Sequence, residues 1–113
     1  MNIVDSKSIP FRHNTHGPKY LMEGPLSKFG IVKLLPKEVA SPHYHKVMEE
    51  NFFVLEGSVC VQTDKETFTL TKGQFLNVPP TTPHKVYNPF DTELVMVISL
   101  APATEGDKYS IEM

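Results

Sequence analysis

The sequence predicts a small all-β protein, either a sandwich of two sheets or a closed barrel. Ten prolines and six glycines divide its 113 residues into short stretches. These stretches are rich in Val, Ile, Phe, Leu and Thr, which favour strands. Seven of them have the usual length of a strand, and that number suits two packed sheets or a barrel. The predicted strands are 29–35, 51–55, 59–63, 66–71, 75–78, 84–88 and 93–100.

Turn residues separate several of these strands. Leu55-Glu56-Gly57 is expected to form a hairpin, because glycine accepts the positive φ that such turns require. Asp64-Lys65 provides a second, polar turn. In the strand that follows, Phe68 and Leu70 alternate with threonines, which indicates one buried face and one exposed face.

Residues 1–25 differ from the rest of the chain. Pro10, Pro18 and Pro25, with Gly17 and Gly24, are expected to prevent any long regular element there. We therefore expect an N-terminal arm that lies over a barrel formed by residues 26–113, within one domain. The arm also carries apolar residues that a second copy of the barrel would cover, so a homodimer is expected. These residues are Ile9, Phe11, Tyr20, Leu21 and Met22.

Composition excludes several classes of partner. The net charge is −2 and the eleven Lys and Arg residues are scattered, so no nucleic-acid surface is expected. The longest apolar runs, 52–55 and 94–100, are much shorter than the roughly 20 residues of a membrane helix. Cys60 is the single cysteine, and the N-terminus lacks the features of a signal peptide. A cytoplasmic location is expected.

Four residues form a candidate metal site. His43 and His45 are two residues apart, so on a strand their imidazoles point to the same face. Glu50 shares a strand face with Phe52, and His84 follows a stiff run of prolines at 79–83. Three neutral imidazoles and one carboxylate leave two positions open on an octahedral ion, which suits Fe, Mn, Co or Ni better than a closed structural zinc site.

Two segments carry a family resemblance. The segment 43–57, HYHKVMEENFFVLEG, resembles the first cupin motif, in which His-x-His is followed by Glu and Gly at fixed spacings. The segment 73–88, GQFLNVPPTTPHKVYN, resembles the second cupin motif. Lys37 and Thr81 stand where the family usually has glycines. Both are turn positions, and neither Lys nor Thr tolerates positive φ well.

The resemblance implies a double-stranded β-helix, or jelly-roll, barrel that binds a metal. The ligands it implies are His43, His45, Glu50 and His84, and the expected cofactor is one divalent transition ion per chain, with Fe, Mn, Co, Ni and Zn all open. Phe52 and Val86 share strand parity with Glu50 and His84 and are the expected pocket residues.

The resemblance leaves the reaction open, because cupin barrels host many activities. The expected function is a metal-dependent enzyme that acts on a small molecule. No second catalytic residue is evident, which favours dioxygenase-like oxidation, whereas an additional His or Glu near the site would argue for proton transfer. Decarboxylase, isomerase or lyase activity is an alternative, and a non-catalytic barrel that binds or senses a small ligand is another. His13 and His16 are assigned no role.

Overall fold

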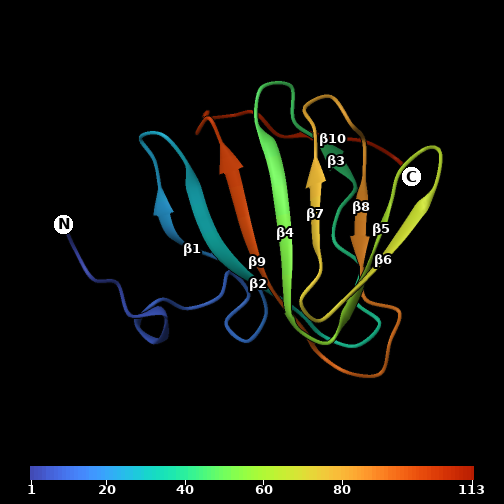
Figure 1. Ribbon diagram of the computed structural model, residues 1–113, viewed down its shortest axis with the longest axis horizontal. Coiled ribbons are helices and arrows are strands. Elements are labelled where there is room, and N and C mark those ends of the chain that lie inside the picture. The colour runs from blue at the N-terminus through green and yellow to red at the C-terminus, as the bar shows by residue number, and fades with distance from the viewer.

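The computed structural model describes all 113 residues, and its regular structure is almost entirely antiparallel strands (Figure 1). The largest sheet has five strands in the order β1-β2-β9-β4-β7, and a second has three in the order β6-β5-β8. A short pair, β10-β3, completes the barrel. The elements are η1 (Ser6–Ser8), β1 (Gly17–Glu23), β2 (Lys28–Leu34), β3 (His43–Tyr44), β4 (Glu49–Glu56), β5 (Ser58–Gln62), β6 (Thr67–Thr71), β7 (Phe75–Val78), β8 (Lys85–Tyr87), β9 (Leu94–Ala101) and β10 (Tyr109–Ser110).

The two larger sheets enclose a core of 14 buried hydrophobic residues. Strand β9 shows how the sequence builds this core: its residues alternate between buried and half-buried along all eight positions, as expected for a strand with one face inward. Phe52 and Val54 of β4 pack into the same cluster as Val59 and Val61 of β5. The all-β prediction is confirmed, and each of the seven predicted strands lies within two residues of an observed one.

The hairpin expected at Leu55-Glu56-Gly57 is wrong. Strand β4 pairs with β7 and β9, whereas β5 pairs with β6 and β8, so the chain passes from one sheet to the other at Gly57. Gly57 has a φ of +79°, and a Cβ there would collide with the Glu93 carbonyl oxygen. Glycine is therefore required both for its φ and for this close approach.

The expectation that residues 1–25 contain no long regular element is wrong for β1. This strand pairs antiparallel with β2, with a register shift between Tyr20 and Met22. It lies at the edge of the five-stranded sheet, where Pro18 can be accommodated because an edge strand does not need every N–H for a partner. Before it, η1 and a bridge between Phe11 and Asn14 are the only regular features.

Lys37 and Thr81 adopt the left-handed backbone conformation that glycine favours, with φ of 68° and 67°. The turns of the family motif are therefore kept although the glycines are not. The only helical segment, η1, has three residues, so the structure contains no helix that could span a bilayer.

Candidate metal centre

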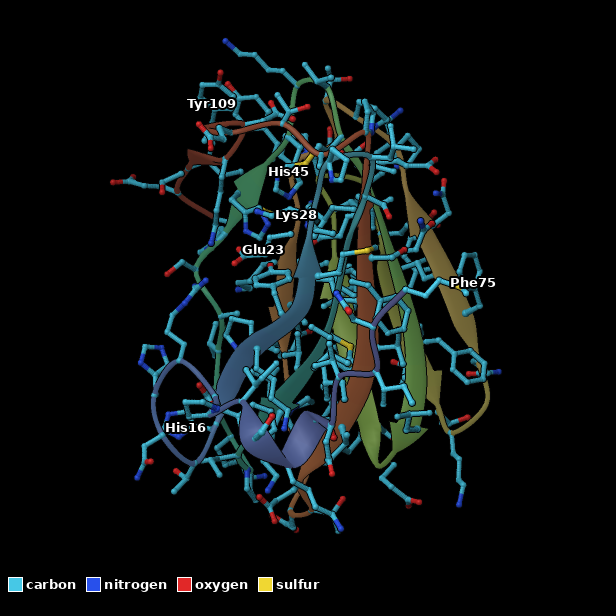
Figure 2. All side chains as sticks on the ribbon, turned by 90° about the vertical axis from the view of Figure 1, so that its left-hand side faces the viewer. His16, Glu23, Lys28, His45, Phe75 and Tyr109 are labelled. Atoms are coloured by element: carbon cyan, nitrogen blue, oxygen red, sulfur yellow. The ribbon has the colours of Figure 1, made fainter.

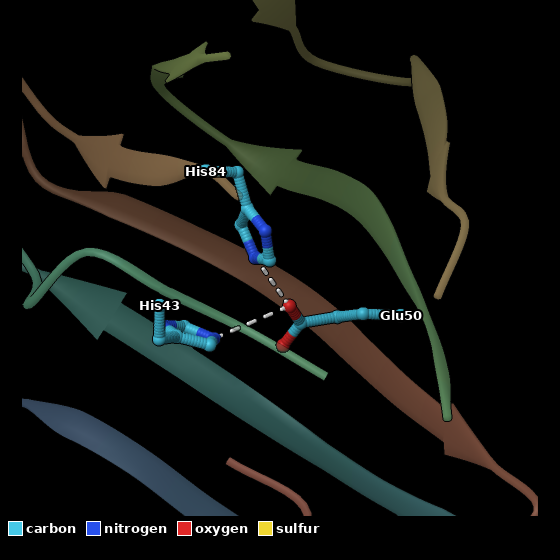
Figure 3. Close-up of side chains that lie close together, drawn as sticks. All are labelled: His43, Glu50 and His84. Atoms are coloured by element: carbon cyan, nitrogen blue, oxygen red, sulfur yellow. Dashed lines mark hydrogen bonds and ion pairs between the residues drawn. The ribbon is translucent and has the colours of Figure 1, made fainter. Parts of the chain in front are cut away.

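Three histidines converge on one oxygen of Glu50. The Glu50 Oε1 atom lies 2.7 Å from His84 Nε2 and 3.6 Å from His43 Nε2 (Figure 3). It lies 3.5 Å from His45 Nε2. The ligand atoms of His43, Glu50 and His84 all lie within 4.8 Å of one another. The structure therefore brings together all four residues that the sequence indicates. His43, Glu50 and His84 form a group of mutually close ligand atoms, and His45 lies next to the same Glu50 oxygen.

Backbone contacts orient the three imidazoles. His43 and His84 face each other across an isolated bridge in which each N–H donates to the other's carbonyl at 3.0 Å. The Nδ1 atoms of His43, His84 and His45 lie within hydrogen-bond distance of the carbonyl oxygens of Ser41, Thr82 and Asp107. Because a carbonyl oxygen only accepts, each Nδ1 carries the hydrogen, and a neutral ring then presents the Nε2 lone pair to Glu50.

The electrostatics of this cluster call for positive charge. Burial raises the pKa of Glu50, but the neighbouring imidazoles of His43, His45 and His84 outweigh it and hold that pKa well below its usual range. Burial lowers the pKa of His45, whereas Glu50 and Asp107 together raise it above its usual value. An ionised carboxylate and three nitrogen lone pairs repel one another unless a proton or a cation lies between them.

The His45 Nε2 atom is buried and is the only buried side-chain nitrogen or oxygen without a hydrogen-bond partner. Buried polar atoms nearly always have a hydrogen-bond partner, so the absence of one at His45 Nε2 needs an explanation. A divalent ion between the three Nε2 atoms and the carboxylate would give His45 a partner and neutralise Glu50. The residues present thus fit a first-row transition ion with nitrogen and oxygen ligands.

Asp107 supports the site and was not anticipated from the sequence. Its buried carboxylate accepts hydrogen bonds from the backbone N–H groups of Lys46, Val47 and Met48 at 2.8–2.9 Å. Burial raises the pKa of Asp107, but these three bonds outweigh it and lower that pKa. Its carbonyl oxygen also accepts a hydrogen bond from His45 Nδ1, so Asp107 holds both His45 and the loop that follows it.

A cavity of about 370 Å³ reaches the cluster from outside. Phe52 and Val86, the two expected pocket residues, both line it, as do His43, His45 and Glu50. His84 does not border the cavity, and neither do Lys37 and Lys85.

Polar residues from the first 28 positions also line this cavity, and sequence reasoning missed them. His13, for which no role was expected, is among them, whereas His16 lies 3.8 Å from Glu38 in an ion pair. No local pattern marks these residues, because they reach the cavity only when β1 joins the sheet. In Figure 2, Glu23 and Lys28 are labelled near His45 at this open side of the barrel, and all three line the cavity. The missed residues are Arg12, His13, Tyr20, Glu23 and Lys28.

Comparison with known proteins agrees with this architecture. A profile of the cupin domain family (Cupin_2) matches residues 30–100. The polyketide synthase CurC of Streptomyces cyaneus is 40% identical over 73 residues, which cover 65% of this chain and 47% of CurC. The quercetin 2,3-dioxygenase of Bacillus subtilis is 43% identical over 42 residues, or 37% of this chain and 12% of that protein.

A solved structure resembles the whole chain. The polyketide cyclase RemF of Streptomyces resistomycificus superposes with a TM-score of 0.83 at 16% identity, covering 100% of this chain and 87% of RemF. The chain spans about half the length of CurC and a small part of the dioxygenase. The matched profile covers both histidine-bearing segments and most of the barrel, and the chain belongs to the cupin domain family.

Proposed function

We propose that the protein is a metal-dependent enzyme that acts on a small, oxygen-rich organic molecule. The observation that carries this proposal is the convergence of three imidazole Nε2 atoms on the Glu50 carboxylate at the inner end of a cavity. His43, His45, Glu50 and His84 would hold one divalent ion. Such an ion, when bound, polarises a substrate oxygen and stabilises negative charge on it.

The titratable side chains in the cavity favour a reaction that moves protons, such as cyclisation or isomerisation. Oxidation was expected from the sequence because no second catalytic residue was evident. The cavity, however, is lined by His13, Tyr20 and Glu23 in addition to the cluster. Groups of this kind can donate or accept protons at a bound substrate. The name of the relative CurC, a polyketide synthase, agrees with an oxygen-rich carbon substrate.

Dioxygenase-like oxidation is the second candidate. The match to quercetin 2,3-dioxygenase supports it, although that match covers 42 residues. Apolar side chains beside the cluster, including Phe52, Val86 and Met96, would provide a partly dry cavity for such a reaction. Decarboxylation or elimination would use the same metal and fewer protein groups.

The first experiment tests the metal site. Protein purified without chelator or affinity tag is analysed by elemental mass spectrometry beside a variant in which His43, His45 and His84 are alanine. We expect about one transition ion per wild-type chain and none in the variant. If neither protein binds any divalent ion after anaerobic loading, the metal enzyme is excluded and a metal-free binding barrel becomes the leading function.

The second experiment separates the two reactions. Protein loaded with iron is given diols, diketones and phenols while dissolved oxygen is recorded, and zinc-loaded protein is given hydroxyacetone in D₂O while C–H exchange is followed by NMR. Proton transfer predicts exchange without oxygen uptake. Oxygen uptake that requires the three histidines would establish oxidation instead. Ligands that raise the melting temperature but are never converted would indicate a binding protein.

A further inference from the structure

Tyr20 lines the cavity because its partner on the neighbouring strand β2 is a glycine, Gly30. Strand register aligns Tyr20 with Gly30 on β2, then with Ile98 and Phe52 on the next two strands. Gly30 has no side chain, and a Cβ there would lie 3.1 Å from Tyr20 Cδ1. The tyrosine ring therefore lies over the β2 backbone, on the inner face that also carries Glu50. Lys28 Nζ, 5.1 Å from the ring centroid, packs against the same ring.

The Tyr20 hydroxyl is available to a ligand. No hydrogen bond joins it to another protein group, and the ring packs against the core and lines the cavity. Burial, followed by the charge of Glu50, raises the pKa of Tyr20, so the phenol keeps its hydrogen at neutral pH. A protonated phenol without a partner in the protein can donate a hydrogen bond to a bound ligand.

The acidic groups around the cavity are largely occupied by other parts of the protein. Glu50 faces three histidines, Asp107 accepts three backbone N–H bonds, and Glu38 accepts the Leu35 N–H and pairs with His16. Glu23 is the remaining acid, and it lies opposite Lys28 in the β1–β2 register.

The cavity-lining cations, in contrast, have no carboxylate partner. Arg12, Lys28 and Lys108 line the cavity, and none of them forms an ion pair. Arg12 and Tyr20 line the same cavity, and the charge of Arg12 acts to lower the pKa of the phenol, against burial. A guanidinium without an ion-pair partner and a hydroxyl donor on the wall of one cavity can together bind a carboxylate, because the guanidinium fork matches both carboxylate oxygens.

We propose that Arg12 and Tyr20 form a carboxylate-binding subsite, and that the substrate is a small organic carboxylate with a further oxygen that faces the histidine cluster. This inference rests on the proposed function and names its substrate class. Tyr20 would be a substrate-contacting residue, donating to the carboxylate through its hydroxyl. Arg12, which lies at the exposed end of the cavity, would supply the opposite charge.

The test compares salicylate with salicylamide, which has nearly the same shape but no charge. Their dissociation constants are measured by calorimetry on wild type and on Arg12→Gln, Tyr20→Phe and Lys65→Gln. Lys65 lies in the β5–β6 turn outside this cavity and serves as the control cation. We expect wild type to prefer salicylate by about ten-fold or more, as a charged hydrogen bond contributes.

Arg12→Gln should abolish this preference, Tyr20→Phe should weaken salicylate binding several-fold, and Lys65→Gln should change neither. Tyr20→Phe should also keep the wild-type melting temperature, because no hydrogen bond joins the lost hydroxyl to a protein group and the ring remains packed against the core. Equal binding of both probes by wild type, no binding of salicylate, or an equal loss in Lys65→Gln would overturn the subsite.

Metal content is measured separately on each variant. If wild type holds no metal but prefers salicylate through Arg12, the proposed function fails and the subsite stands. If metal is bound and the preference is absent, the subsite fails and the proposed function stands.

Discussion

The histidine cluster depends on residues that are not ligands. His45 would be free to rotate if its Nδ1 did not meet the Asp107 carbonyl, and the loop after it is held by the Asp107 carboxylate. Groups that orient metal ligands in this way usually affect metal affinity strongly. A change at Asp107 should therefore affect both the histidine cluster and the stability of the loop that follows His45.

We expect Asp107→Asn to lower the free energy of unfolding of the metal-free protein by about 2 kcal/mol, because an amide cannot accept all three buried N–H bonds. Metal affinity should fall by about ten-fold. Urea unfolding and metal competition titrations check the two effects, and Glu105→Gln, on an exposed residue nearby, is the control. Unchanged metal affinity would show that Asp107 does not orient the ligands.

Thr81 combines a branched side chain with a φ of 67°. The left-handed conformation costs an L-residue about 1–2 kcal/mol, and a β-branched residue is especially unsuited to it. Its backbone N–H donates to the His45 carbonyl, so the turn is held in place by the site itself.

Thr81→Gly is expected to raise the free energy of unfolding by about 1 kcal/mol, since relief of the strained φ outweighs the greater freedom of glycine in the unfolded chain. Differential scanning calorimetry measures the change. Thr82→Gly is the matched control: Thr82 has no positive φ, so that variant should be less stable than wild type. If both variants lose stability equally, Thr81 is not strained.

The passage between β4 and β5 sets the shape of the barrel. At Gly57 the chain leaves the five-stranded sheet and enters the three-stranded one, so Glu50 on β4 and the core residues of β5 come to face one interior. The close approach of Gly57 to Glu93 joins this corner to the start of β9.

Gly57→Ala should destabilise the protein much more than Gly73→Ala. Both glycines have positive φ, +79° and +84°, but a Cβ on Gly57 meets the Glu93 backbone and a Cβ on Gly73 meets nothing within 4 Å. Gly73→Ala therefore reports the φ strain alone, about 1 kcal/mol, and Gly57→Ala adds a backbone clash of roughly 2 kcal/mol more. Equal losses in chemical denaturation would argue against the clash.

The outer face of the five-stranded sheet carries a row of apolar side chains. The register aligns Ile31, Val97, Phe53 and Phe75 in one row across four strands, and Phe53 and Phe75 are 40% and 62% exposed. Exposed apolar patches of this kind often form interfaces. The homodimer expected from the sequence remains a prediction, and this row, as well as the N-terminal residues, would be covered in it.

Phe75→Glu is expected to convert a dimer into a monomer, because a charge would be buried in the interface without a partner. Analytical ultracentrifugation should give twice the 12.8 kDa chain mass for wild type and a single chain mass for the variant. Phe68→Glu, at a half-exposed phenylalanine on the other sheet, is the control. A monomeric wild type would exclude the dimer.

Local sequence patterns were sufficient to predict much of the secondary structure and the histidine cluster of this protein. The seven predicted strands follow from turn residues and β-branched content, which act over a few positions. The spacing of His43, His45, Glu50 and His84, read with the family motifs, was enough to select four residues that meet in space. Lys37 and Thr81 were recognised as turn positions, and both have a positive φ, which neither residue type was expected to tolerate well.

Other features depend on contacts between distant parts of the chain. Pro18 and Gly17 indicate an irregular segment locally. Residues of β1 nevertheless form a strand, because hydrogen-bonded pairing with the neighbouring strand β2 outweighs their weak local preference. Asp107 and Tyr20 lie 62 and 30 residues from His45 and Glu50 along the chain. No local pattern can reveal such neighbours. The ligand spacing is thus a property of short segments, whereas the cavity and its supporting contacts exist only once the strands have assembled.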